Sequence, residues 1–120
     1  MPTTISARIA FYGMFPSPSL EAQIHGEVEA LTMSFDRITS CRVSVELPHR
    51  HQRHGSLYRV VLEIGVPRGH VVVARSPEGS AAHADAHVAV RDAFRAAHRQ
   101  LEEHRRRHGR TIRVRQSNAV

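Results

Sequence analysis

The feature that most constrains the fold is a regular alternation of apolar and polar residues in the middle of the chain. It runs through residues 40–47 and again through residues 57–66, with an apolar side chain at nearly every second position. A period of two places these side chains on one face of a β-strand. A Pro-Arg-Gly tripeptide then predicts a tight reversal into a short strand over residues 70–75. The sequence therefore predicts an antiparallel meander of three strands with one apolar face.

Three further segments complete the predicted secondary structure. Residues 4–12 alternate like the central segments and predict a fourth strand. A helix is expected over residues 18–35, because its apolar residues are spaced by four, four, three and four positions, and Ser17 is a suitable cap. A second, longer helix is expected over residues 85–108, with Gly109 ending it.

The element order βαβββα predicts an α+β fold, a four-stranded mixed sheet with two helices packed on one face. The other face of the sheet is expected to lie in water. At 120 residues the chain is long enough for one domain with a modest core. We expect residues 1–108 to form this domain and residues 109–120 to form a flexible basic tail.

The charged residues favour a polyanionic partner. There are 17 basic residues, all of them arginine, and 11 acidic residues, which gives a formal net charge of +6. The planar arginine fork suits bidentate contacts with phosphate. The composition therefore favours nucleic acid as the partner, although an arginine-only composition also arises from genomic bias.

Other aspects of the composition narrow the class of protein. Cys41 is the only cysteine, which excludes an intrachain disulfide framework, and its alternation with valines predicts a buried core position. There is no signal-peptide pattern and no apolar run of about 20 residues, so the sequence predicts a soluble cytoplasmic protein. There is also no nucleophile elbow, phosphate-binding glycine loop or CxxC motif. We expect neither enzymatic activity nor a cofactor.

The second predicted helix carries the main candidate RNA-binding residues. Arg91, Arg95 and Arg99 follow one another at i,i+4 spacing, and Arg105 and Arg106 lie near the helix end. Like charges at this spacing repel one another, so the pattern suits a position beside phosphates. The alternative is a solvated face that neighbouring glutamates partly neutralise.

The segment between the second and third predicted strands permits two interpretations. His49, His51 and His54 have the spacing of metal ligands, whereas Arg50 and Arg53 between them oppose a dication. As a hairpin tip, the same five residues can face RNA, with the imidazoles donating to phosphates. We predict an accessory RNA-binding rim, with a metal site and a solvated tip as the alternatives.

Another group of possible ligands is formed by His83, Asp85 and His87. His83 precedes the predicted helix start, and His87 lies near its apolar boundary. Asp85 is a suitable cap or first-turn acid for the helix. Capping and packing are therefore expected here rather than metal binding.

Three stretches of the sequence are shared in order and spacing with a known family. They are LTMSFDRITSCRVSVELPHR at residues 31–50, GSLYRVVLEIGVPRGHVVV at residues 55–73 and DAHVAVRDAFRAAHRQLEEHRRR at residues 85–107. Together they resemble short members of the ribosome hibernation-promoting factor family, also described as ribosome-associated inhibitors or ribosomal subunit interface proteins. The resemblance implies the βαβββα fold and a stress factor. Such a factor binds the rRNA of the small ribosomal subunit near the decoding channel and occludes the messenger and transfer RNA sites.

Two departures limit what the resemblance implies. The first predicted helix carries Glu21, Glu27 and Glu29, with His25 as its only potential cation, whereas family members typically have basic residues there. The sequence also ends shortly after its second predicted helix, so we expect no C-terminal domain that pairs ribosomes.

The sequence thus predicts a monomeric translation inhibitor that binds the small ribosomal subunit and has no membrane or small-molecule partner. The expected phosphate contacts are Arg91, Arg95, Arg99, Arg105 and Arg106, the accessory rim is His49, Arg50, His51, Arg53 and His54, and Arg37 and Arg75 are secondary candidates. Two alternatives stay open, namely a His-rich metal-binding protein and a general double-stranded RNA-binding module.

Overall fold

The computed structural model describes residues 5, 7–47, 58–75 and 85–119. Its elements are β1 (Ala7–Tyr12), α1 (Pro18–Ser34), β2 (Ser40–Glu46), β3 (Arg59–Val66), β4 (Gly69–Arg75) and α2 (Ala86–Ala119). The predicted element order βαβββα is therefore confirmed.

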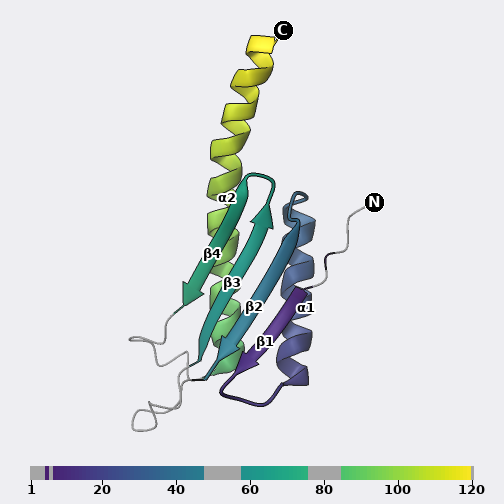
Figure 1. Ribbon diagram of the computed structural model, residues 1–120, viewed down its shortest axis with the longest axis vertical. Coiled ribbons are helices and arrows are strands. Elements are labelled where there is room, and N and C mark those ends of the chain that lie inside the picture. The colour runs from purple at the N-terminus through teal and green to yellow at the C-terminus, as the bar shows by residue number, and fades with distance from the viewer. Residues whose placement is uncertain (1–4, 6, 48–57, 76–84, 120) are drawn as a thin grey trace.

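The four strands form one mixed sheet in the order β1-β2-β3-β4. β1 and β2 are parallel, because α1 returns the chain to the same end of the sheet between them, whereas β3 is antiparallel to both of its neighbours. Both helices lie side by side on one face of the sheet, with α1 along β1 and α2 along β3 and β4 (Figure 1). The predicted α+β fold with two helices on one face is confirmed.

The apolar face predicted from the alternation forms the core. Alternate residues of β2 and β3 are buried, and the cross-strand neighbours Val43 and Leu62 are fully covered. The core residues of the helices are Leu20, Ile24, Val28 and Leu31 in α1, and Ala89, Val90, Ala93, Phe94, Ala96, Ala97 and Leu101 in α2. Four of the α2 residues are alanines, whose small side chains let the helix approach the sheet closely.

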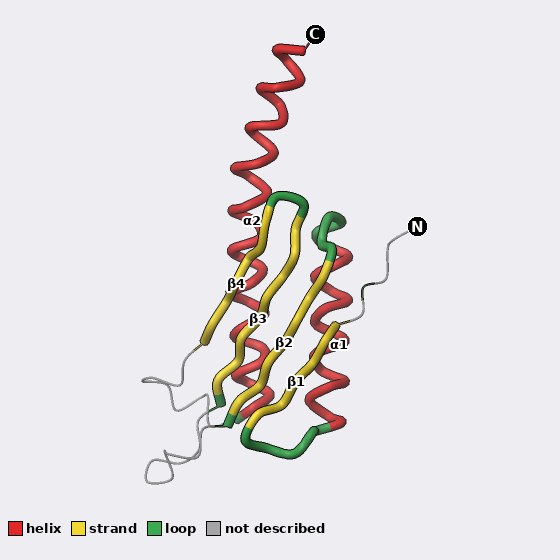
Figure 2. Tube along the Cα trace, in the orientation of Figure 1, coloured by secondary structure: helices red, strands yellow, loops and turns green. Residues whose placement is uncertain are grey.

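α2 is longer than the sequence predicts. It continues through Gly109 to Ala119, so the expected helix end at Gly109 is wrong. A single glycine costs a helix only about 1 kcal/mol relative to alanine, and no proline follows that would stop it. The last turns project beyond the end of the sheet where β3 turns into β4 (Figure 2). The flexibility of residues 109–120 stays a prediction.

The predicted caps and the predicted turn are present. Ser17 Oγ accepts a hydrogen bond from the Leu20 amide at 3.3 Å, and Asp85 Oδ1 accepts one from the His87 amide at 2.9 Å. In the β3–β4 turn, Gly69 has a φ of 144°, which glycine adopts without steric cost. The β3–β4 turn, the α1–β2 loop and the middle of α2 come together at one end of the sheet (Figure 2).

Candidate nucleic-acid interface

Four arginines of α2 form an exposed row that we call the arginine stripe, consisting of Arg91, Arg95, Arg99 and Arg106. At about 100° per residue they fall within an arc of about 80°, on the side of α2 opposite its buried residues. The stripe covers about 22 Å along the helix axis. The structure therefore brings four of the five predicted α2 arginines together on one exposed face.

Arg105, the fifth predicted contact, lies toward α1 and is held by neighbouring groups. Its guanidinium carbon lies 4.8 Å from the centroid of the Phe35 ring, and it forms an ion pair with Glu102. Arg105 also donates to the carbonyl oxygen of Ser34 at 3.4 Å. A cation is favourable there because the C-terminal end of α1 carries partial negative charge. Arg105 thus joins α2 to the end of α1, and its contact with phosphate stays a prediction.

Glu27 of α1 lies beside the N-terminal half of the arginine stripe. Burial raises the pKa of the Glu27 carboxyl above its ordinary value of 4.5, and the charges of Arg95 and Arg91 partly offset this effect. Arg99 and Arg106, by contrast, have no ion pair within the part of the chain that the structure describes. The C-terminal half of the stripe therefore carries the less compensated positive charge.

Hydrogen bonds between the helices fix the start of α2. His87 Nδ1 donates to Gln23 Oε1 at 2.5 Å, and Gln23 Nε2 donates to the His87 carbonyl oxygen at 2.8 Å. The predicted capping role of Asp85 is confirmed, whereas His87 is exposed and forms hydrogen bonds to α1 instead of packing in the core, and His83 lies outside the described residues. Together with the contacts of Arg105 further along α2, these bonds hold the helix with its stripe facing outward.

The predicted accessory rim lies outside the described residues. This applies to His49, Arg50, His51, Arg53 and His54, so both the RNA-binding rim and the metal site there stay predictions. Among the residues that the structure does describe, no three metal-ligating side chains lie close enough to hold one ion.

Cys41 is buried in β2, and the predicted core position is confirmed. Burial raises the pKa of its thiol from an ordinary value of 9.0 to about 11. Near neutral pH the thiol therefore stays protonated, a form that is a poor nucleophile.

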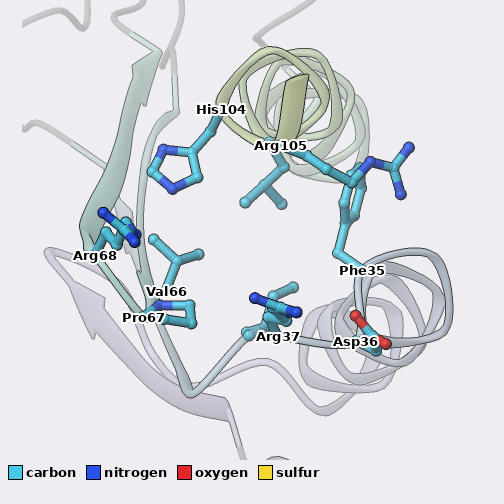
Figure 3. Close-up of a pocket in the computed structure, with 10 residues that line it drawn as sticks. Phe35, Asp36, Arg37, Val66, Pro67, Arg68, His104 and Arg105 are labelled. Atoms are coloured by element: carbon cyan, nitrogen blue, oxygen red, sulfur yellow. The ribbon is translucent and has the colours of Figure 1, made fainter. Parts of the chain in front are cut away.

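A second basic cluster lies at the end of the sheet from which α2 projects. Arg37 of the α1–β2 loop and Arg68 of the β3–β4 turn lie around a pocket of about 310 Å³, with Arg105 on its α2 side (Figure 3). The sequence predicts Arg37 as a secondary candidate but does not associate it with Arg68. The signal that could have done so is topological, because both residues lie in connections at the same end of two paired strands. Arg75, the other secondary candidate, lies at the opposite end of β4.

The chain is similar to known proteins in sequence and in structure. The profile of the family described as "Sigma 54 modulation protein / S30EA ribosomal protein" matches residues 8–109 of this 120-residue sequence. The chain belongs to the S30EA family. The match extends from the second residue of β1 into α2 and so includes nearly the whole sheet and all of the arginine stripe.

Two solved structures resemble the S30EA chain. A ribosomal subunit interface protein from Coxiella burnetii has 13% sequence identity and a TM-score of 0.66, with 82% of this chain and 96% of that chain covered. The N-terminal domain of Protein Y from Thermus thermophilus has 16% identity and a TM-score of 0.65, with 86% and 100% covered. At such low identities the similarity shows the fold. A search of curated proteins gives no match.

The resemblance predicted from the sequence is confirmed by S30EA membership, and the chain is a member of a ribosome-associated family. Within the described part of the S30EA chain, neither helix is long and apolar enough to cross a membrane.

Proposed function

We propose that this protein is a translation inhibitor that binds the rRNA of the small ribosomal subunit near the decoding channel. There it occludes the messenger and transfer RNA sites under stress. The observation that carries the proposal is the arginine stripe, which presents four guanidinium groups on one face of a helix in a chain of a ribosome-associated family. The protein acts by occupying a site, so the proposal includes no catalytic step.

The affinity arises mainly from charge neutralisation. Each arginine that approaches an rRNA phosphate releases condensed counterions, so the affinity falls steeply as the salt concentration rises. Four phosphate contacts predict that the logarithm of the binding constant falls by about 3 to 4 for each tenfold increase in salt. The hydrogen bonds between Gln23 of α1 and His87 of α2 fix the helix that carries the stripe, so binding does not have to order its backbone.

Recognition relies on the shape of the rRNA more than on stacking of successive bases. Of the two tyrosines, Tyr12 is exposed at the end of β1 and Tyr58 is half-buried against the core. Two such residues cannot provide the row of aromatic rings that single-strand-binding sheets use. A helix lined with arginines fits the shape-dependent and phosphate-dependent recognition of folded RNA.

The proposal is tested by co-sedimentation of the full chain with purified small subunits over a salt series. Large subunits and an unrelated RNA duplex serve as controls. We expect tight association with small subunits at low salt, a linear decrease of log affinity with log salt, and weaker binding to both controls. An absence of association at low salt would overturn the proposal. Equal affinity for the unrelated duplex would identify a general double-stranded RNA-binding module instead.

A further inference from the structure

The pocket at the projecting end of α2 has an apolar lining. Phe35 and Ile38 come from the end of α1 and the following loop, Val66 and Pro67 from the end of β3 and the turn after it, and Leu101 from α2. The volume of about 310 Å³ lies at the small end of the range that is typical of sites for small ligands. The pocket therefore has room for one small apolar group.

The rim of this pocket is basic. Arg37, Arg68, His104 and Arg105 surround it, and Asp36 is the one acidic residue that lines it (Figure 3). The three arginines come from three different connections or helices, so their convergence is a property of the tertiary structure and not of a local charge run.

Two of the rim arginines are available to a ligand. Arg105 is engaged by Glu102 and by the Phe35 ring. Arg37 and Arg68 are both exposed, and neither has an ion pair within the described part of the chain. Two guanidinium groups at the mouth of an apolar pocket suit an anion attached to an apolar body, and arginine forks suit phosphate in particular.

We propose that this pocket binds one nucleotide, with the base against Phe35, Ile38 and Leu101 and the phosphate at Arg37 and Arg68. The faces of a base are flat and apolar and can contact the apolar lining, whereas its polar edges can face the rim of the pocket. The same chemistry is offered by an unpaired nucleotide of rRNA and by a free nucleotide. The rRNA source rests on the function proposed above.

The surroundings of the pocket favour a nucleotide over the carboxylate of a partner peptide. The part of the chain from residue 104 to the C-terminus, which includes the projecting end of α2, contains six arginines and no acidic residue. Leu101, His104 and Arg105 of α2 line the pocket, so the pocket adjoins the start of this basic segment. The pocket therefore lies beside a strongly basic segment, which favours a ligand that carries phosphate.

The direct test is an NMR titration of the ¹⁵N-labelled full chain with AMP and with UMP. Ribose 5-phosphate, which lacks the base, and adenosine, which lacks the phosphate, are the control ligands. We expect the nucleotides to shift the amide resonances of Ile38, Arg68 and Leu101 and to bind at least tenfold more tightly than either control. No shift at these residues would overturn the proposal. Equal affinity of ribose 5-phosphate would also overturn it, because it would indicate an anion site only.

Two variants separate the contributions of the base and the phosphate. Val66→Phe fills the pocket and leaves every charge in place, and it should abolish nucleotide binding while the rest of the spectrum is unchanged.

Arg37→Gln with Arg68→Gln removes two exposed charges, does not disturb the core, and should weaken AMP binding about tenfold or more. The matched control is Arg8→Gln with Arg42→Gln, an exposed cross-strand pair on the open face of the sheet. An equal loss in the control pair would refute the phosphate site.

Co-sedimentation of Val66→Phe with small subunits identifies the source of the nucleotide. If nucleotides bind the wild-type pocket, a fivefold or larger loss of subunit affinity in this variant assigns the pocket to an rRNA nucleotide, and unchanged affinity assigns it to a free nucleotide.

The two proposals can fail separately. Subunit binding without nucleotide binding would refute the pocket, and nucleotide binding without subunit binding would refute the ribosomal function. A short acidic peptide that binds in place of AMP would identify a protein partner and would also refute the nucleotide proposal.

Discussion

Helices α1 and α2 both pack apolar residues against the sheet, but their outer faces carry opposite charge. Both lay an apolar row on one face of the sheet, and the two rows share a single core. Outside that row, α1 carries Glu21, Glu27 and Glu29, whereas α2 carries the arginine stripe. The buried row determines the fold, so the outer residues can vary without changing it, and we expect them to determine the partner.

The two helices also differ in how far they follow the sheet. α1 has 17 residues and stops near the end of the sheet at which β2 begins. α2 has 34 residues and continues beyond that end (Figure 1). Besides the Gln23–His87 contact, the two helices meet at Phe35, the residue after α1, whose ring centroid lies 4.8 Å from the Arg105 guanidinium carbon and 5.1 Å from the His98 ring. A substitution at Phe35 therefore tests how much the contact between the two helices contributes to stability.

The largest expected effect comes from Phe35→Ala. The Phe35 side chain is only 7% exposed, so truncation leaves a cavity and removes the contacts with Arg105 and His98. We expect the free energy of unfolding to fall by about 3 to 5 kcal/mol, measured by urea denaturation. The matched control is Phe15→Ala, because Phe15 is 89% exposed, and its effect should stay within about 0.5 kcal/mol. A loss below about 1 kcal/mol for Phe35→Ala would show that the two helices are not joined there.

Periodicity predicts both helices and all four strands, because burial repeats every two residues in a strand and every 3.6 in a helix. It does not predict where α2 ends. Beyond the sheet no apolar row marks the boundary of the helix, and Gly109 by itself is a weak terminator. The expected end at that residue is wrong for this reason.

The next largest effect concerns the arginine stripe. Arg91→Gln, Arg95→Gln and Arg99→Gln together should reduce affinity for the small subunit about a hundredfold or more near physiological salt. The slope of log affinity against log salt should fall by about 3, because each lost phosphate contact removes about one unit. Co-sedimentation over a salt series measures both quantities.

A control with the same loss of charge separates position from net charge. Arg8→Gln, Arg42→Gln and Arg59→Gln remove three positive charges from the strands, where Arg59 pairs with Glu46 at 3.5 Å. We expect a decrease of less than about fivefold for this variant. An equal decrease in both variants would mean that the contrast between the helices does not determine binding.

The site was predictable to the extent that it lies on one helix. Arg91, Arg95 and Arg99 share a face because of helical spacing alone. The pocket was not predictable in this way, since Arg37 and Arg68 approach each other only when two connections meet at the end of the sheet. The role of Arg105 depends in turn on where α1 ends, which is a property of packing and not of spacing.

A smaller effect on stability is expected when the single glycine of each helix is replaced by alanine. Gly26 of α1 is exposed, and a Cβ added there meets no atom within 4 Å, so plain tolerance explains this glycine. Gly26→Ala should therefore raise the free energy of unfolding by about 1 kcal/mol. Gly109→Ala lies in the part of α2 beyond the sheet, and it should increase the helical circular dichroism signal with a change in stability below about 0.5 kcal/mol. Equal stabilisation by both would show that the projecting turns unfold together with the domain.

The smallest expected effect concerns Glu27, through which the acidic helix α1 approaches the arginine stripe. Glu27→Gln removes a negative charge next to Arg95 and Arg91, so affinity for the small subunit should rise about two- to threefold. The matched control is Glu29→Gln, which removes the same charge from an exposed position of α1 and should change affinity less. An equal increase in the two variants would attribute the effect to net charge.

The pH dependence of stability gives an independent check on Glu27. Because burial raises the pKa of this carboxyl in the folded state above 4.5, protons favour the folded state as the pH falls. This contribution is complete below pH 4.5 and is lost as the pH rises through the raised pKa. Glu27→Gln should therefore stabilise the protein relative to wild type at pH 7, and the difference should shrink toward zero near pH 4 in urea denaturation. The pH-dependent part of this difference in the free energy of unfolding would then measure the cost of ionising the partly buried Glu27 carboxyl. If the stability difference between Glu27→Gln and wild type does not depend on pH, burial does not raise the pKa of the Glu27 carboxyl.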